Sequence, residues 1–221
     1  MLTLVPTPVG NLEDMTLRAL SSLKSCDLVI AEDTRKSGLL LRHFGIEKPL
    51  QSFHTANEHK VVERLVERLE GGLNACLVTD AGTPGISDPG FLLVREALKK
   101  GVEVSCLPGP TAFVPALVSS GIPCERFCFE GFLPHKKGRL TRLKELEEEK
   151  RTMVFYESPH RIMKALNEFV THFGPDRPAC LSREISKMFE QHIRGSLAEI
   201  IQRCSEKEIK GEVVMIVQGK S

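Results

Sequence analysis

The chain has 221 residues, of which 41% are hydrophobic and 27% are charged. This composition is typical of a folded globular protein, and the length suffices for one large domain or two modest ones. Thirty Lys and Arg against 29 Asp and Glu give a net charge of +1, which excludes nucleic-acid binding through a globally basic surface. No apolar run is long enough for a membrane span, and no signal peptide follows Met1, so we expect a cytoplasmic protein without a membrane partner.

Seven cysteines are spread along the chain, mostly singly and often within apolar runs. An odd number in this arrangement favours reduced thiols over a disulfide framework. Cys124 and Cys128 form the one close pair, but zinc needs two further thiol or imidazole ligands at a suitable spacing, and none is nearby. We therefore expect buried thiols and no metal site.

The first half of the chain alternates short apolar runs with helical patterns, which is the signature of a mainly parallel α/β sheet. Leu, Val and Phe recur at steps of three and four residues between the runs, as core-facing stripes of helices do. Five strands and four helices are predicted. The strands are residues 2–5, 27–31, 50–53, 75–79 and 102–107.

The second half begins after a helix predicted at residues 111–120. Some of its strands lack a long helix between them, which indicates a mixed sheet and hence a second α/β domain. The predicted domains are residues 1–115 and 116–221, joined by a short linker near residues 113–122. The strands are residues 126–130, 152–156, 179–182, 191–194 and 213–218, and the helices are residues 138–148, 160–171 and 196–204.

The most unusual segment is the loop of residues 80–90, Asp-Ala-Gly-Thr-Pro-Gly-Ile-Ser-Asp-Pro-Gly, between a predicted strand and a helix. In an open α/β sheet, ligands bind beyond the carboxyl ends of the strands. Three glycines let the backbone approach a ligand closely, and two prolines stiffen the loop. The structural alternative is a tight turn with Asp88 as helix cap and Pro89 as first helical residue. That turn needs only two or three of the eleven residues, so we favour a binding site.

Two further loops, residues 6–11 and 108–112, follow other strands of the same domain and should line the same rim. Neither a Walker loop nor a G-x-G-x-x-G fingerprint is present, which disfavours a phosphate cradle and an ordinary Rossmann cofactor site. The pattern favours a nucleoside-like ligand held by backbone groups.

Charged residues follow a buried strand at Glu32, Asp33, Arg35 and Lys36. They suit substrate handling, but Asp33 or Thr34 could equally cap a helix. The polar group at residues 54–59, which holds His54 and His59, has the same two interpretations, and a lone histidine there is more often a surface or cap residue.

The second half has two polar segments of interest. Residues 155–161 end an apolar strand, and a helix start with Ser158 as cap and Pro159 as first residue accounts for those two but leaves Glu157, His160 and Arg161 unexplained. Residues 134–144 hold five basic groups and no acidic one, in a half with 18 basic and 15 acidic side chains. A solvated helix start is one interpretation; because basic charge there opposes the helix dipole, a bound anion is the other.

Taken together, six segments resemble one family in collinear order from residue 2 to about residue 219. They resemble the bacterial ribosomal RNA small subunit methyltransferase I family, a branch of the tetrapyrrole methylase superfamily. Six motifs in order make this resemblance far more specific than any single loop. The segments are residues 5–12, 31–35, 80–90, 107–112, 130–134 and 155–161.

The resemblance implies two α/β domains of the tetrapyrrole methylase type with S-adenosylmethionine (AdoMet) in the cleft between them, and no metal. It also implies a homodimer that methylates the 2′-oxygen of a cytidine ribose in the decoding region of 16S ribosomal RNA, within the 30S subunit. The cofactor positions carried over by motif are Pro8, Ala81, Gly82, Thr83, Ile86, Thr111, Ala112, Glu157 and Gly195. The superfamily often has an apolar residue at the position of Glu157.

The implied chemistry is in-line transfer of a methyl group to a ribose 2′-oxygen, for which alignment provides much of the acceleration. A carboxylate that accepts the hydroxyl proton would help, and Asp33, Glu32 and Glu157 are the candidates. Candidates for contacts with RNA phosphates are Arg35, Arg161, Lys136, Lys137 and Arg139.

The C-terminal end departs from the family pattern. Relatives commonly continue into a small helical segment, whereas this sequence ends three residues after the last predicted strand. Two alternatives are therefore kept. The first is a related methyltransferase that acts on a tetrapyrrole carbon, as in precorrin methylation. The second is an AdoMet-binding or RNA-binding module without catalysis.

Overall fold

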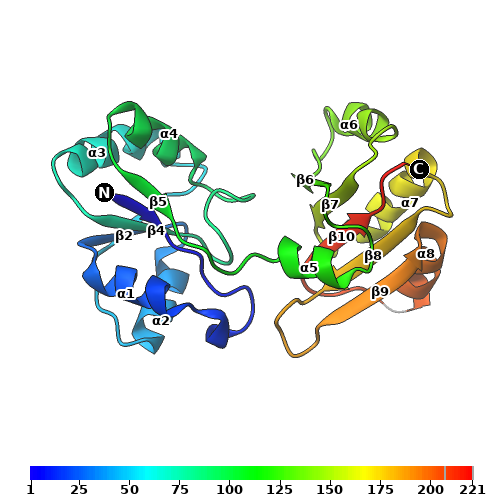
Figure 1. Cartoon of the computed structure of the whole chain (residues 1–221), viewed down its shortest axis with the longest axis horizontal. Coiled ribbons are helices and arrows are strands. Elements are labelled where there is room, and N and C mark those ends of the chain that lie inside the picture. The colour runs from blue at the N-terminus through cyan, green and yellow to red at the C-terminus, as the bar shows by residue number, and fades with distance from the viewer. Residues whose placement is uncertain (207, 221) are drawn as a thin grey trace. The chain divides into compact units, whose positions relative to one another are not determined.

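Ten strands form two five-stranded sheets among residues 1–206 and 208–220, which the computed structural model describes (Figure 1). Each sheet belongs to its own unit, Met1–Thr111 and Ala112–Ser221. The predicted pair of α/β domains is confirmed. The division falls four residues before the predicted boundary after residue 115, at the start of the helix α5 (Phe113–Ser119).

The first sheet is entirely parallel, as the buried, Val- and Leu-rich strands predict. Its strand order is β3-β2-β4-β1-β5. Helices α1 and α2 cover one face, and α3 and α4 cover the other (Figure 1). The elements are β1 (Leu2–Leu4), η1 (Leu12–Asp14), α1 (Leu17–Ser25), β2 (Leu28–Ala31), α2 (Thr34–His43), β3 (Leu50–Ser52), α3 (Glu58–Glu70), β4 (Ala75–Val78), α4 (Phe91–Lys99) and β5 (Val104–Cys106).

Helix α4 begins later than the sequence indicates. The expected start, with Asp88 as cap and Pro89 as first residue, is wrong, because Gly90 precedes the helix at φ 152°. A side chain at Gly90 would be strained at this φ and would lie 3.3 Å from Leu77 Cδ2. The glycine therefore lets the loop of residues 80–90 turn tightly onto β4 before the helix begins.

The second sheet is mixed, as predicted, with strand order β6-β7-β10-β8-β9. Only β6 and β7 are parallel neighbours, and the other pairs are antiparallel. Its elements are β6 (Phe127–Phe132), α6 (Arg139–Leu146), β7 (Thr152–Glu157), α7 (Ile162–Phe173), β8 (Pro178–Arg183), β9 (Gln191–Ser196), α8 (Leu197–Glu206) and β10 (Val213–Val217).

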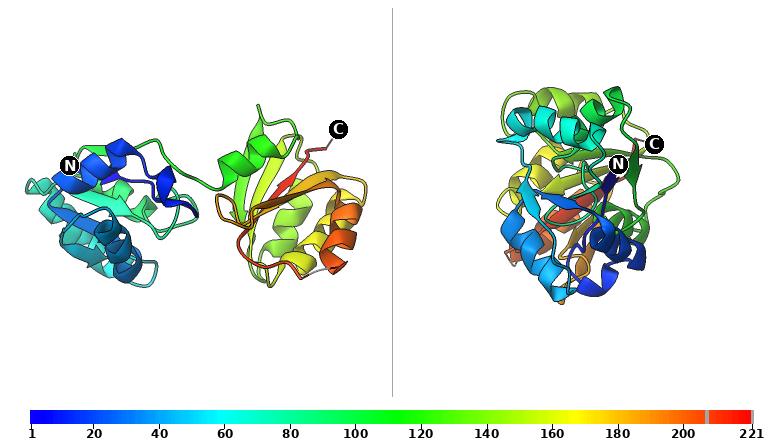
Figure 2. Two further views of the ribbon diagram at one scale, coloured as in Figure 1. Left: turned by 90° about the horizontal axis from the view of Figure 1, so that it is seen from below. Right: turned by 90° about the vertical axis from the view of Figure 1, so that its left-hand side faces the viewer.

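Alternation along the strands gives this sheet two apolar faces. Phe155 and Met215 belong to the cluster with α7 and α8, whereas Val154 and Val214 belong to the cluster with α5. Figure 2 shows α7 and α8 side by side on one face and α5 on the other.

Helix α7 also starts later than predicted. It begins at Ile162, so the expectation that Ser158 caps it and Pro159 opens it is wrong. The Ser158 hydroxyl instead accepts a hydrogen bond from the His160 N–H at 3.3 Å in the turn that precedes the helix. Among the described residues, no helix is long and apolar enough to cross a membrane.

Candidate functional site

Three loops meet at the carboxyl edge of the parallel sheet, as the sequence predicts. The loop after β1 pairs with the loop after β4, because the Thr7 N–H donates to Gly82 O and the Gly82 N–H donates to Thr7 O, both at 2.9 Å. The Thr83 hydroxyl donates to Pro110 O in the loop after β5 at 3.0 Å. The rim loops, residues 5–11, 79–90 and 107–111, therefore form one connected structure.

Two glycines make this close approach possible. A Cβ atom on Gly109 would lie 2.7 Å from Pro6 Cβ, so only glycine lets these two loops pack together. Gly82 has φ +85°, which side chains rarely adopt, and a Cβ atom there would touch Val9 at 3.6 Å and Thr111 at 3.9 Å. Close packing thus requires glycine at position 109, and the backbone conformation favours it at position 82.

The other carried-over positions of the first unit lie on these same loops. Pro8 follows the Thr7 pairing, and Ala81 precedes Gly82. The Ile86 N–H donates to Thr83 O at 3.2 Å, which closes the turn inside the loop after β4. Six of the nine predicted cofactor positions, Pro8, Ala81, Gly82, Thr83, Ile86 and Thr111, are therefore in or beside one set of joined loops.

A hollow of about 360 Å³ opens between the loop after β1 and α2, and charged side chains border it. Lys36 Nζ lies 2.6 Å from Asp80 Oδ2, and the hydrogen bond to Asp80 raises the pKa of Lys36. The Thr79 hydroxyl donates to Glu32 Oε2 at 2.7 Å. Asp80 Oδ1 is buried and has no hydrogen-bond partner among the described residues. This oxygen is an acceptor that a hydroxyl or ammonium group of a ligand would satisfy.

The pair of Lys36 and Asp80 is not evident from the sequence. Asp80 opens the unusual loop of residues 80–90, and Lys36 ends the charged segment after β2, but they are 44 positions apart. Because β2 and β4 are parallel neighbours in the sheet, the segments that follow their carboxyl ends lie side by side. A predicted strand order would therefore have indicated this pair.

Asp33 has a structural role in addition to its proposed chemical one. Its side chain caps α2 by accepting from the Arg35 N–H at 2.9 Å. Arg35 Nη2 lies 2.7 Å from Asp33 Oδ2, and the hydrogen bonds from Arg35 hold the pKa of Asp33 well below its usual range. The helix-cap alternative is thereby confirmed, and Arg35 stays highly exposed at the rim.

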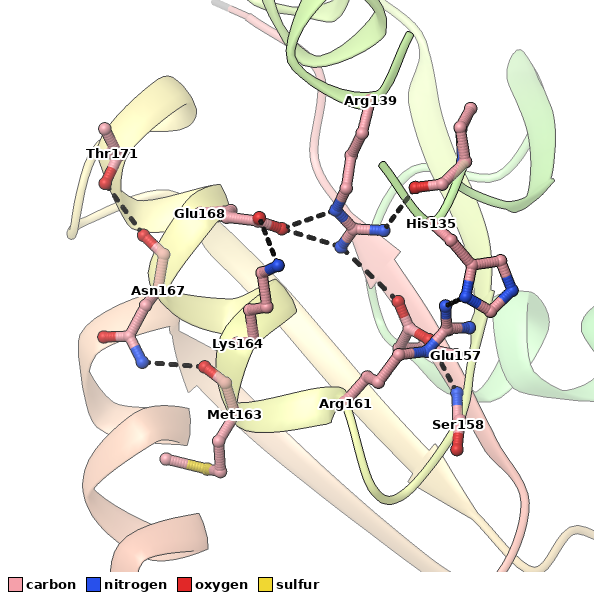
Figure 3. Close-up of polar contacts among 11 residues, drawn as sticks. His135, Arg139, Glu157, Ser158, Arg161, Met163, Lys164, Asn167, Glu168 and Thr171 are labelled. Carbon is pink, nitrogen blue, oxygen red and sulfur yellow. Dashed lines mark hydrogen bonds and ion pairs between the residues drawn. The ribbon is translucent and has the colours of Figure 1, made fainter. Parts of the chain in front are cut away.

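In the second unit, Glu157 is buried between two arginines (Figure 3). Arg161 Nη2 lies 2.8 Å from Glu157 Oε1, and Arg139 Nη2 lies 3.5 Å from Oε2. The Ser158 N–H also donates to Oε1, at 2.8 Å. The carboxylate of Glu157 is therefore occupied by groups of its own unit.

Arg139 is only 6% exposed, which corrects the expectation that it faces RNA phosphates. Its guanidinium reaches Glu168 of α7 at 2.7 Å as well as Glu157 (Figure 3). The negative charge that offsets a basic residue at this helix start is thus provided by the carboxylates of Glu157 and Glu168. Lys136 and Lys137, which precede it, are exposed. Arg161 is 27% exposed, and Nη1 contacts His135 Nδ1 at 2.5 Å.

Glu157 and Gly195 are not brought together. The sheet register aligns Glu157 with Val213, Arg183 and Gln191, whereas Gly195 lies four residues further along β9 and three strands away from β7. These offsets place the two residues on the order of 20 Å apart. They are therefore at opposite ends of the second sheet and cannot hold adjacent groups of one ligand. Ala112 begins the second unit as the N-cap residue of α5.

The remaining candidates have modest roles. Asn57 Oδ1 accepts from the His54 N–H at 2.8 Å, which stabilises the turn before α3.

Among the described residues, no group of three or more His, Cys, Asp or Glu is arranged to hold a metal ion. Burial raises the pKa of the Cys128 thiol to about 11.

A family model for tetrapyrrole (corrin/porphyrin) methylases matches residues 1–201, and the chain therefore belongs to this family. The fold agrees, because a crystal structure of diphthine synthase covers 100% of this chain and 90% of its own at a TM-score of 0.76. Its sequence identity is 17%, so this likeness concerns the fold alone.

Within the family, the chain is similar to proteins named ribosomal RNA small subunit methyltransferase I. The protein of that name from Pasteurella multocida is 48% identical over 223 residues, which are 100% of this chain and 79% of the relative. The one from Thermotoga maritima is 42% identical over 219 residues, which are 99% of this chain and 98% of the relative. Relatives of this name thus include a longer form and one of nearly equal length.

Proposed function

We propose that this chain is an AdoMet-dependent methyltransferase of small-subunit ribosomal RNA, and that it methylates the 2′-oxygen of a cytidine ribose in the decoding region of 16S RNA. The observation that carries the proposal is identity of 48% over the whole chain to a protein named for methylation of this RNA. The nucleotide and the oxygen follow from the motif resemblance. We also propose that the protein acts as a homodimer, in the cytoplasm, on the 30S subunit.

The joined loops of the first unit fit AdoMet. Glycine backbone at Gly82 allows close approach, and the hydroxyl of Thr83 and the backbone of Thr111 lie beside it. The unmatched acceptor Asp80 Oδ1 suits a cofactor that carries ammonium, amino and ribose hydroxyl donors. Pro8, Ala81 and Ile86 complete this part of the proposed site. Ala112, Glu157 and Gly195 are the proposed contributions of the second unit, of which Glu157 and Gly195 lie too far apart to hold adjacent groups of the ligand.

The cofactor supplies an activated methyl group, and the protein has to orient the accepting hydroxyl and take its proton. Of the three candidate bases, Asp33 is held by Arg35, which lowers its pKa and weakens it as a base. Glu157 is enclosed by Arg139 and Arg161. Glu32 lies at the rim of the first sheet, and the hydrogen bond from the Thr79 hydroxyl goes to its Oε2. We therefore rank Glu32 first as the residue that accepts the proton.

RNA phosphates are the proposed partners of Arg35, Arg161, Lys136 and Lys137, which are exposed or partly exposed. Arg139 is left out of this group because it is buried in ion pairs. The net charge of +1 requires such local contacts, since the whole surface does not attract RNA.

The test is incubation of the protein with labelled AdoMet and small subunits that lack the modification, followed by digestion of the RNA to nucleosides. The expected result is label in 2′-O-methylcytidine. Label in a nucleobase would contradict the 2′-oxygen as acceptor. Label in a precorrin but not in RNA would indicate the tetrapyrrole reaction, and AdoMet binding without transfer to either substrate would indicate a binding module.

A further inference from the structure

A second hollow lies in the first unit, between the start of α3 and the start of α4. Its volume is about 420 Å³, within the range of small-ligand sites. None of the residues that border it also borders the hollow beside α2. Only residues 87–90 belong to the rim loops. The bordering residues are Thr55, Glu58, His59, Ser87, Asp88, Pro89, Gly90, Phe91, Leu92 and Arg95.

The unusual feature of this hollow is an exposed aromatic ring. Phe91 is 69% exposed although it is the first residue of α4 and its neighbours Leu92 and Leu93 are buried. The Arg95 guanidinium carbon lies 5.5 Å from the centre of the Phe91 ring, one helical turn away. Arg95 Nε also pairs with Glu96 Oε1 at 2.8 Å, and the Arg95 side chain is 47% exposed. Ring and guanidinium thus form a surface that is open to solvent.

The backbone beside the ring is strained. Ser87 has φ +64°, and it is one of three non-glycine residues with positive φ among the described residues. Such conformations persist where the surrounding structure requires them, and they cluster at ligand-binding positions. Ser87 lies in the loop of residues 80–90, and Phe91 follows that loop as the first residue of α4. Asp80, at the start of the loop, borders the charged hollow beside α2.

The chemistry of the hollow matches an unpaired RNA base better than a phosphate. An exposed aromatic ring with an adjacent arginine is the surface on which single-stranded bases stack. Glu58 borders the hollow, where its carboxylate would repel a phosphate but accept a hydrogen bond from an exocyclic amino group. The mixed charge thus favours a base edge over the RNA backbone.

We propose that Phe91 and Arg95 form a stacking site for an unpaired RNA base that neighbours the methylated nucleotide. This site rests on the proposed function for its RNA substrate, but its role in binding is separate from methyl transfer. When the target ribose is drawn to the cofactor loops, an adjacent base loses a stacking partner. Phe91 replaces that partner and holds the RNA in register.

The test measures RNA binding by the full chain with a short single-stranded oligoribonucleotide that contains 2-aminopurine. Phe91→Leu keeps the apolar bulk and removes the aromatic face, and we expect it to weaken RNA binding by about 5- to 100-fold. Phe91→Tyr retains the face and should bind within about twofold of the wild type. Stacking quenches the 2-aminopurine fluorescence on binding to the wild type, and the quenching should disappear in Phe91→Leu.

Phe189→Leu is the matched control, because Phe189 is also 69% exposed but belongs to the second unit. It should leave binding and quenching unchanged, and AdoMet affinity should be the same in all variants. Wild-type RNA binding and quenching retained by Phe91→Leu would overturn the stacking site, as would a wild type that fails to bind the oligonucleotide. If the wild type binds and quenches but methylates no small subunit, the proposed function fails and the stacking site stands.

Discussion

A buried guanidinium links two helices and a strand of the second unit. Arg139 at the start of α6 contacts Glu157 at the end of β7 and Glu168 within α7. Burying these charges is costly, so the network is stable only while each charge keeps its partners. This explains why a basic residue at a helix start, which opposes the helix dipole, is compatible with the fold.

Arg139→Ala should lower the free energy of unfolding by about 3 kcal/mol, because it removes one of the two arginine partners of the buried Glu157 carboxylate and the short ion pair with Glu168. Urea unfolding of the full chain measures this loss. Lys137→Ala is the matched control two residues away, where an exposed side chain is removed, and it should cost less than about 0.5 kcal/mol. Equal effects of the two substitutions would show that Arg139 is not held as described.

Gly82→Val should abolish AdoMet binding in calorimetry. The Val side chain is disfavoured at φ +85° and would press against Val9 and the backbone of residues 110 and 111, where the proposed cofactor loops meet. Gly72→Val is the control, since Gly72 has φ +99° but a Cβ atom there would meet no other atom within 4 Å, and it lies away from the rim. Unchanged AdoMet affinity in Gly82→Val would contradict the assignment of the loop.

The positions of the site loops were predictable from the sequence, whereas the partners of their charged side chains were not. Glycine and proline spacing after apolar strands identifies the loops of residues 6–11 and 80–90. Ion pairs such as Lys36 with Asp80 and Arg139 with Glu157 join residues 44 and 18 positions apart. No local pattern specifies such pairs, because they depend on which strand ends become neighbours.

At the scale of elements, strand positions follow closely from apolar runs, and helix starts follow less well. Each of the ten strands overlaps its predicted range. The clearest signal comes from fully buried strands such as β2, β4 and β10, which leave a continuous apolar run in the sequence. Helices α4 and α7 begin after the cap residues that the sequence indicates. In both cases a Ser-Pro or Asp-Pro pair that typically opens a helix is used in the preceding turn.

The turn before β7 predicts a pH effect. Arg151 donates from its side chain and backbone to Glu149, and these bonds lower the pKa of Glu149 to about 2. An acid with a lowered pKa in the folded state stabilises it above the unfolded value of about 4.3, and this contribution is lost as the pH falls toward 2. Glu149→Gln should therefore cost about 1 kcal/mol at pH 6, given partial exposure of the pair. The difference from the wild type should vanish near pH 2 in denaturant unfolding, and a constant difference would contradict the pairing.

The exposed loop between β6 and α6 carries the remaining basic patch. Lys136→Ala with Lys137→Ala should weaken RNA binding and lower the slope of log affinity against log salt by about 1.5, as expected for two lost phosphate contacts. Fluorescence anisotropy over a range of salt concentrations measures the slope. Lys164→Ala is the control substitution in the same unit. An unchanged slope in the double variant would show that Lys136 and Lys137 are solvated residues before a helix and do not bind RNA.

At the scale of the whole molecule, each unit has its own sheet and its own apolar clusters. The proposed cofactor positions are divided between them, with Pro8, Gly82 and Thr111 in the first unit and Glu157 and Gly195 in the second. A ligand bound by both units stabilises both, because it binds the folded form of each.

Hydrogen exchange with and without AdoMet therefore distinguishes a shared site from a site within one unit. We expect protection of the loops at residues 5–11 and 79–90, and also of backbone near Glu157 or Gly195 in the second sheet. Because these two residues lie at opposite ends of that sheet, protection at only one end would identify which of them contacts the cofactor. Protection confined to residues 1–111 would contradict a contribution from the second unit. In the Gly82→Val variant, AdoMet should protect neither unit.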